Sequence, residues 1–199
     1  MKVAIIDYGM GNLYSVEQAL IRLGAEVIVT SDEETLNASD ALVLPGVGAF
    51  PDAMARLAEL ELIAPIQKTT KPLLGICLGM QLLFEESEEV RKTKGLGILK
   101  GRIDKFKNVS RIPHIGWNEL TFTDGIHTGK NYVYFVHSFY ANGTLQEEVI
   151  ACTDYEGVKV PAIVGRHNFT GMQFHPEKSG EFGMHLLQEW LQKVGVTVC

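Results

Sequence analysis

Apolar runs with the length of buried strands alternate with amphipathic segments through the first half of the chain. The strand-like runs are residues 2–8, 25–31, 40–46 and 71–77, and the helix-like segments are residues 15–23 and 51–67, with another helix expected after Cys77. Parallel strands need a long crossover connection, which a helix supplies, and strands that are apolar on both faces are typical of a sheet covered on both sides. The alternation therefore predicts a three-layer α/β fold with an open, mostly parallel sheet and helices on both faces.

The pattern changes in the second half. From Lys94 to Val164, short β-rich runs are separated by turns rather than by long amphipathic helices, which predicts an additional antiparallel or mixed β portion. A last strand at residues 171–175 precedes a final helix. The apolar residues on one face of that helix are Phe182, Leu186, Trp190, Leu191 and Val194. No repeat, linker or low-complexity tract divides the sequence, so we expect one domain over residues 1–199.

The composition limits the function classes. The formal net charge is −6 at pH 7, which argues against sequence-independent binding to nucleic acid or anionic lipid, because both need clustered Lys and Arg. No run is long enough to span a membrane, and the N-terminus lacks a signal-peptide pattern. The three cysteines, Cys77, Cys152 and Cys199, are odd in number and far apart, so we expect free thiols in a reducing, cytoplasmic compartment.

Cys77 lies in the sequence Gly75-Ile76-Cys77-Leu78-Gly79, between an expected strand and an expected helix. This G-x-C-x-G spacing is that of a nucleophile elbow, in which small residues on either side let a tight turn close. The start of a helix favours the thiolate form, and the N–H of Leu78 would point to the same space as an oxyanion donor. The alternative is a buried cysteine that only fills the core.

A thiolate nucleophile also needs an acid and base, and His175 is the best placed of the six histidines. It ends an apolar strand at the carboxyl edge of the expected sheet, and Pro176 then forces the chain out of regular structure. In an extended segment, Glu177 would point the same way as His175 and hold its tautomer, which completes a Cys-His-Glu triad. The alternative for Glu177 is a carboxylate that caps the last helix.

Two glycine-containing loops have more than one interpretation. Residues 44–50, LPGVGAF, could supply main-chain donors to an oxyanion hole or form an ordinary strand-to-helix turn. Residues 7–12, DYGMGN, begin like a dinucleotide-binding fingerprint, but Tyr14 occupies the place of its third glycine, so no nicotinamide cofactor is expected. No group of His, Asp or Glu shows metal-ligand spacing, so no metal is expected either.

Three motifs in this order resemble those of the triad-type, class I glutamine amidotransferases. They are PGVGAF at residues 45–50, GICLGMQ at 75–81 and HPEKS at 175–179. The resemblance implies a flavodoxin-like glutaminase fold that needs no cofactor. It also implies that Cys77 attacks the side-chain amide of L-glutamine, that His175 is the acid and base, and that Glu177 orients it. Ammonia is then released for use elsewhere.

Further segments resemble the glutaminase subunits of imidazole glycerol phosphate synthase within that family. They are DYGMGNLYSV at residues 7–16, IPHIGWNE at 112–119 and YFVHSFY at 134–140. The resemblance implies a heterodimer with a (β/α)₈ cyclase subunit, which uses the ammonia to make imidazole glycerol phosphate and aminoimidazole carboxamide ribotide in histidine biosynthesis. The implied site residues are Gly46, Val47, Gly48 and Leu78 for the oxyanion hole, Gly48, Gln81, Ser138 and Phe139 for glutamine, and Asn12, Trp117 and Lys178 for the partner.

Phe139 departs from the family's pattern, which often has a tyrosine there, so only main-chain contacts to the substrate are expected from it. Two other functions fit parts of the sequence. One is the amidotransferase subunit of a different synthase, such as anthranilate synthase, which would associate with a different partner. The other is a non-catalytic flavodoxin-like module in which Cys77 senses oxidants from the start of a helix.

Overall fold

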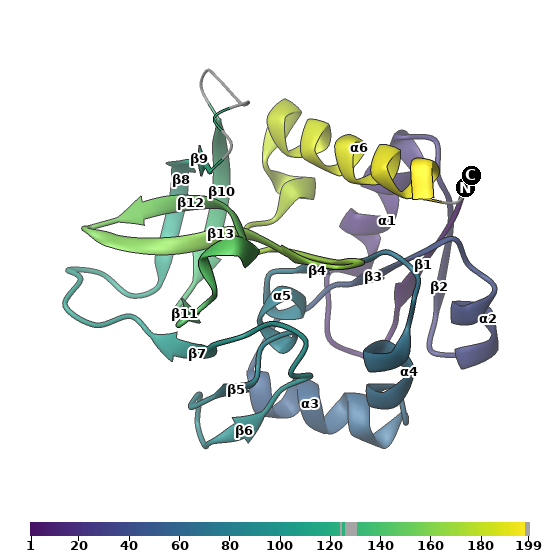
Figure 1. The fold of residues 1–199 in the computed structure, drawn as a ribbon, viewed down its shortest axis with the longest axis horizontal. Coiled ribbons are helices and arrows are strands. Elements are labelled where there is room, and N and C mark those ends of the chain that lie inside the picture. The colour runs from purple at the N-terminus through teal and green to yellow at the C-terminus, as the bar shows by residue number, and fades with distance from the viewer. Residues whose placement is uncertain (124, 126–130, 198–199) are drawn as a thin grey trace.

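The computed structural model describes residues 1–123, 125 and 131–197, and Figure 1 shows the large sheet at its centre. This sheet has eight strands in the order β2-β1-β3-β4-β14-β13-β12-β9. Its parallel part comprises β1 (Lys2–Ile6), β2 (Glu26–Thr30), β3 (Ala41–Leu44), β4 (Leu73–Ile76) and β14 (Phe169–Met172). Its antiparallel part comprises β13 (Val158–Arg166), β12 (Val149–Tyr155) and β9 (Thr121–Phe122). The predicted open, mostly parallel sheet with an antiparallel portion is confirmed.

Two smaller sheets extend the antiparallel half of the fold. One pairs β8 (His114–Glu119) with β10 (Tyr132–His137). The other has the order β11-β7-β5-β6, from β11 (Phe139–Asn142), β7 (Arg102–Lys105), β5 (Glu86–Ser87) and β6 (Thr93–Lys94). Every pairing in these sheets is antiparallel except β5 with β7. The mixed β portion is therefore present, and it begins at β5, slightly before the predicted Lys94.

Helices cover both faces of the large sheet (Figure 1). One face carries α1 (Leu13–Arg22) and α6 (Gly180–Thr197), and the other carries α2 (Glu33–Asn37), α3 (Phe50–Glu59), α4 (Ile63–Lys68) and α5 (Leu78–Leu82). In β1, Val3 and Ile5 pack into the first core while Ile6 packs into the second, and all three are fully buried. Burial of such a side chain contributes about 1.5–3 kcal/mol, so both faces of the strand stabilise the sheet.

The last helix presents the predicted apolar face to the sheet. Leu186, Trp190, Leu191 and Val194 are buried in the core that α6 shares with α1, and Phe182 packs against that core. Among the residues that the structure describes, no helix is both long and apolar enough to cross a membrane. Cys77 and Cys152 are buried free thiols, as predicted. The third cysteine, Cys199, lies outside the described residues.

The single helix predicted over residues 51–67 is wrong, because α3 ends at Glu59 and α4 begins at Ile63. Between them, the N–H of Leu62 donates to the Leu57 carbonyl at 2.9 Å, and Glu61 adopts a positive φ of 56°. A continuous helix would place Pro65 in its interior, where proline costs about 3 kcal/mol. A new helix at Ile63 instead puts Pro65 in a first turn, where no main-chain N–H is needed.

The last strand also differs from the prediction. β14 ends at Met172, so His175 lies three residues beyond the strand rather than at its end. The reason is a change of hydrogen-bond partner. The N–H of Gln173 still donates to Ala162 in β13 at 2.9 Å, whereas the N–H of His175 donates to the carbonyl of Tyr134 in β10 at 3.2 Å. The chain therefore crosses from the large sheet to the β8–β10 ribbon before it reaches His175.

The helix α5 lies directly on the backbone of the parallel sheet. A Cβ placed on Gly79 would lie 1.8 Å from the carbonyl oxygen of Leu44 in β3, and a Cβ on Gly75 would lie 2.7 Å from the carbonyl oxygen of Gly79. Both distances are far shorter than a contact between carbon and oxygen. Glycine at these two positions is therefore a packing requirement, and it brings the start of α5 against the ends of β3 and β4.

We predict that Gly79→Ala destabilises the protein by about 3 kcal/mol or more, because its methyl group would meet main-chain atoms that cannot rotate away. Urea unfolding measures the effect. Gly195→Ala in α6 is the control, since its Cβ would lie 3.5 Å from the nearest side-chain atom, of Met1. The control should be neutral or slightly stabilising. Equal unfolding free energies for Gly79→Ala and the wild type would contradict this packing.

Candidate active site

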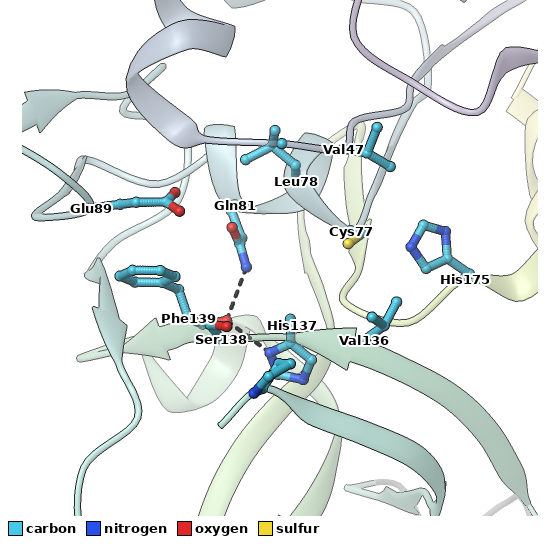
Figure 2. Close-up of a pocket in the computed structure, with 12 residues that line it drawn as sticks. Val47, Cys77, Leu78, Gln81, Glu89, Val136, His137, Ser138, Phe139 and His175 are labelled. Atoms are coloured by element: carbon cyan, nitrogen blue, oxygen red, sulfur yellow. Dashed lines mark hydrogen bonds between the residues drawn. The ribbon is translucent and has the colours of Figure 1, made fainter. Parts of the chain in front are cut away.

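A cavity of about 370 Å³ opens where the parallel strands end, a volume suited to a small molecule. Its walls come from both halves of the fold: segments that follow β3, β4 and β14 face the end of β10 and the start of β11 (Figure 2). The lining residues are Val47, Gly48, Cys77, Leu78, Gln81, Glu89, Pro113, Val136, His137, Ser138, Phe139 and His175. Most residues predicted to act on glutamine are thus brought together here.

Cys77 occupies the turn between β4 and α5, as the elbow motif predicts. Its backbone has φ 55° and ψ −112°, a conformation that costs a residue other than glycine about 1–3 kcal/mol. Two main-chain hydrogen bonds hold it: its N–H donates to Met172 at 2.8 Å, and its carbonyl accepts from Gln81 N–H at 3.1 Å. The strained turn directs the sulfur into the cavity toward the His175 ring (Figure 2).

His175 and Glu177 form a buried pair beside Cys77. The His175 Nδ1–H donates to Glu177 Oε1 at 2.9 Å, and only 5% and 1% of the two side chains is exposed. Burial opposes a charge on the ring, but the adjacent Cys77 and the hydrogen-bonded Glu177 outweigh it and raise the pKa of His175 to about 9. The ring is therefore an imidazolium at neutral pH, able to give up a proton from Nε2.

The contact between His175 and Glu177 is made differently from the prediction. An extended segment was expected to align the two side chains, whereas Pro176–Lys178 forms the 3₁₀ turn η2. The proline at the start of this turn breaks the extended conformation, and the turn carries Glu177 back onto the imidazole. Ser179 supports the turn, because its hydroxyl donates to the His175 carbonyl at 2.7 Å and accepts from Tyr134 N–H at 2.9 Å.

The loop after β3 lies beside Cys77, and only some of its residues line the cavity. Val47, Gly48 and Leu78 line the cavity, but Gly46 does not. A Cβ on Gly46 would lie 2.9 Å from the main-chain nitrogen of Gly79 and 2.6 Å from the Tyr8 hydroxyl, so Gly46 packs against the elbow. Gly48 has a positive φ of 106°, a conformation that favours glycine.

Gln81 projects from α5 into the cavity, and its amide nitrogen is fully used by the protein. Its Nε2 donates to the Phe139 carbonyl and to Gln173 Oε1, each at 3.0 Å (Figure 2 shows the first bond). An amide nitrogen has two hydrogens, so only the Gln81 Oε1, an acceptor, is available to a bound molecule. Ser138 and Phe139 also line this wall, Phe139 with its carbonyl already paired.

Glu89 and His137 line the cavity but were missed in the sequence. Glu89 Oε2 accepts a hydrogen bond from the N–H of Phe50 at 2.8 Å, which fixes the carboxylate at the start of α3. In the sequence Glu89 belongs to an acidic run, residues 85–89, that looks like a solvated surface. His137 directly precedes Ser138, so its position in YFVHSFY was the only available signal.

The residues predicted at a partner interface lie at the start of α1, on η2 and on β8, and β10 connects η2 to β8. η2 contacts both α1 and β10, and β10 pairs with β8. Lys178 on η2 is exposed, Asn12 at the start of α1 is half-buried, and 53% of Trp117 on β8 is exposed. In the described part of the chain, no group of three or more His, Cys, Asp or Glu side chains could hold a metal ion.

Comparison with known protein families matches residues 4–194 to glutamine amidotransferase class I. The chain belongs to the class I glutamine amidotransferase family. Among curated relatives of this amidotransferase is the imidazole glycerol phosphate synthase subunit HisH of Bacillus cereus (strain ATCC 10987 / NRS 248), 53% identical over 197 residues, or 94% of this chain and 93% of the relative. The HisH subunit of Bacillus thuringiensis (strain Al Hakam) gives the same values. The predicted resemblance is confirmed.

Solved structures confirm the class I glutaminase fold of the amidotransferase. A crystal structure of a glutamine amidotransferase has a TM-score of 0.77 and 22% identity, with 97% of this chain and 98% of that chain covered. The structure of PurLQS from Thermotoga maritima has a TM-score of 0.72 at the same identity and coverage. At such low identity these likenesses concern the fold alone.

Tyr8 anchors the loop after β3 in this amidotransferase. Its hydroxyl donates to the Pro45 carbonyl at 2.8 Å, and the side chain is 1% exposed. Burial, and then the negative charge of Cys77, raise the pKa of Tyr8 far above its ordinary value, so the hydroxyl keeps its proton. The bond joins the segment after β1 to Pro45, the residue before Gly46.

We predict that Tyr8→Phe lowers the free energy of unfolding by about 1–3 kcal/mol, because it leaves the buried Pro45 carbonyl without a donor. Tyr14→Phe is the matched control, since Tyr14 is 70% exposed. The control should change stability by less than about 0.5 kcal/mol. Chemical denaturation measures both variants, and equal losses in the two would contradict the role of the Tyr8 hydroxyl.

Proposed function

We propose that this chain is a single-domain glutaminase subunit of an imidazole glycerol phosphate synthase. It hydrolyses L-glutamine to glutamate and ammonia, and it delivers the ammonia to a (β/α)₈ cyclase subunit. The observation that carries the proposal is the Cys77, His175 and Glu177 arrangement at the cavity. Its support is the 53% identity to HisH subunits over nearly the whole chain. The free thiols of Cys77 and Cys152 fit a cytoplasmic location.

Glutamine binds with its amino-acid end against Gln81 and Glu89. The free Gln81 Oε1 and the Glu89 carboxylate are both acceptors, so they suit the α-ammonium group rather than the α-carboxylate. The carboxylate adds charge to that hydrogen bond, which strengthens it. The side-chain amide of the substrate then points to Cys77, and main-chain groups of Ser138 and Phe139 form the facing wall.

The reaction proceeds in two halves. The Cys77 thiolate attacks the amide carbon, and the oxygen that becomes negative accepts hydrogen bonds from main-chain N–H groups of Leu78 and the Gly46–Gly48 loop. His175 Nε2–H gives its proton to the departing nitrogen, so ammonia leaves and a γ-glutamyl thioester forms on Cys77. The neutral His175 then takes a proton from water, which attacks the thioester and releases glutamate. Glu177 keeps the His175 Nδ1 protonated throughout.

The partner binds across α1, η2 and β8, which are connected through β10. An exposed tryptophan is a common anchor of protein interfaces, and Trp117 lies on this face with its ring 6.0 Å from that of Tyr134. Lys178 is next to Glu177 in the sequence, so the face and the triad share the turn η2. Ammonia released beside His175 therefore forms close to the surface that meets the cyclase.

Reconstitution with the cyclase and its nucleotide substrate tests the proposal, with Cys77→Ala as the decisive variant. We expect at least about a 10³-fold loss of glutamine-dependent synthesis, since the nucleophile is gone, and no loss of synthesis from added ammonium, which needs only the cyclase. Cys152→Ala, the other buried free thiol, should keep full activity. Glutamine turnover that survives Cys77→Ala would exclude the triad, and wild-type activity only with another synthase would exclude the cyclase as partner.

Substrate binding is tested with Glu89→Gln, which keeps the shape of the side chain and removes its charge. We expect the KM for glutamine to rise about 10- to 100-fold, the value of a charge-assisted hydrogen bond, with kcat changed only a few-fold. Glu88→Gln, one residue away and exposed, is the matched control. Steady-state glutaminase kinetics give both constants. An unchanged KM for Glu89→Gln would remove Glu89 from the ammonium site.

A further inference from the structure

The segment that follows β1 packs against the loop after β3. Its sequence, DYGMGN, begins like a dinucleotide-binding fingerprint, but its contacts are with this loop. The Tyr8 hydroxyl donates to the Pro45 carbonyl at 2.8 Å. A Cβ on Gly11 would lie 3.2 Å from Pro45 Cγ. A Cβ on Gly48 would lie 2.9 Å from Met10 Cε. The segment therefore supports a loop that lines the cavity.

Tyr8 is a permanent donor to the Pro45 carbonyl. The Tyr8 side chain is 1% exposed, and burial raises the pKa of its hydroxyl far above the ordinary value. The hydroxyl therefore keeps its proton at neutral pH. Pro45 is buried as well, so water does not compete with the hydroxyl for this carbonyl.

The Pro45–Gly46 peptide is held from both sides. The Pro45 carbonyl and the Gly46 N–H belong to one planar group, so the hydroxyl that holds the first also fixes the direction of the second. The elbow lies on the other side. A Cβ on Gly46 would lie 2.6 Å from the Tyr8 hydroxyl and 2.9 Å from the main-chain nitrogen of Gly79. This peptide has no room to rotate.

The next two residues of the loop have different surroundings. Val47 is 43% exposed, Gly48 is exposed with a positive φ of 106°, and both line the cavity. No described residue accepts a hydrogen bond from the main-chain N–H of either one. Donors that the protein does not use are available to an oxygen that becomes negative during a reaction. The loop thus has a buried, fixed part followed by a part that can donate.

We infer that Tyr8 is a positioning residue for the oxyanion hole of the proposed reaction. Its hydroxyl holds the Pro45–Gly46 peptide against the elbow, and this fixed peptide keeps the N–H groups of Val47 and Gly48 at the cavity. Tyr8 does not line the cavity, so it acts through the loop and not on the substrate. The inference rests on the proposed function for the role of these N–H groups. Gly46 is then an anchor of the loop rather than a donor.

The expected signature of this role is a change in kcat rather than in KM. The oxyanion exists only in the transition state and the tetrahedral intermediate, so donors that move away from it slow the reaction without weakening the binding of glutamine. Complete loss of one such donor lowers kcat about 10²- to 10³-fold. Tyr8→Phe displaces donors and removes none, so we expect a smaller loss, about tenfold.

The first test reads the peptide without using activity. Pro45–Gly46 is the only proline–glycine pair in the sequence, so the full chain labelled with ¹³C-carbonyl proline and ¹⁵N-glycine gives one carbonyl–amide signal in NMR. In Tyr8→Phe we expect the carbonyl shift to move to lower frequency, as for a carbonyl that loses its donor. Tyr155→Phe is the matched control, because the Tyr155 hydroxyl makes the same kind of bond, to the Arg111 carbonyl at 2.8 Å. The signal should stay in place in the control. An unmoved carbonyl shift in Tyr8→Phe would overturn the inference.

If Tyr8→Phe does not fold, the wild-type protein decides. With tyrosine labelled at Cζ, the hydroxyl proton of Tyr8 should be visible in NMR and should give a nuclear Overhauser signal with the α-hydrogens of Gly46, which lies against it. A Tyr8 hydroxyl proton that exchanges with water as fast as that of exposed Tyr14 would overturn the inference.

The second test measures glutaminase kinetics with the cyclase and its nucleotide substrate present. Per folded molecule, we expect the kcat of Tyr8→Phe to fall about tenfold and the KM for glutamine to stay within about twofold of the wild type. Tyr155→Phe should keep both constants. An unchanged kcat, or a change in KM alone, would overturn the inference. A wild-type protein that hydrolyses no glutamine would contradict the proposed function, and the NMR signal of the Pro45–Gly46 peptide would still decide whether Tyr8 holds the loop.

Discussion

The site depends on one close contact between main chains, where α5 lies on the ends of β3 and β4 with no side chain between them. Gly75 and Gly79 make that contact possible, since a methyl group on either would overlap a backbone atom. This contact between α5 and the two strands forces Cys77 into a strained backbone conformation and directs its sulfur into the cavity. The strain is offset by the buried cores on both faces of the sheet, which hold the two strands and the helix in register.

Each half of the fold supplies one wall of the cavity, so the site forms only when they pack together. The parallel half contributes Cys77 and the loop after β3, while the antiparallel half contributes His137, Ser138 and Phe139. The segment after β14 joins them, because His175 leaves the large sheet and bonds to Tyr134 in β10. His175, the proposed acid and base, is thereby fixed to the ribbon that also carries one wall of the cavity.

The features of the fold and site that could be predicted from the sequence are those whose cause lies in neighbouring residues. The Gly75–Gly79 motif contains the steric reason for its own turn, and the last helix carries its apolar face in its periodicity. The division of residues 51–67 into two helices was also local, since Pro65 gave the signal, but the apolar periodicity outweighed it in the prediction. The contact of Glu177 with His175 was predicted for an extended segment. In the structure it is made by the 3₁₀ turn η2 instead.

The missed features have causes that lie far along the chain. Glu89 looks like its acidic neighbours, and only its hydrogen bond to Phe50, thirty-nine residues away, distinguishes it. His137 reaches the cavity only because β10 ends there, and Gln81 presents an oxygen only because Gln173 and Phe139 occupy its nitrogen. No spacing rule contains such pairings, since they arise when strands from different segments meet.

In the proposed reaction, the elbow makes Cys77, and not the other buried thiol Cys152, the nucleophile toward glutamine. Labelling with a diazoketone analogue of glutamine, followed by peptide mass spectrometry, measures this directly, with the cyclase present. We expect a single adduct on Cys77, none on Cys152, and protection by excess L-glutamine. An adduct elsewhere, or labelling of Cys77 that glutamine does not slow, would contradict it.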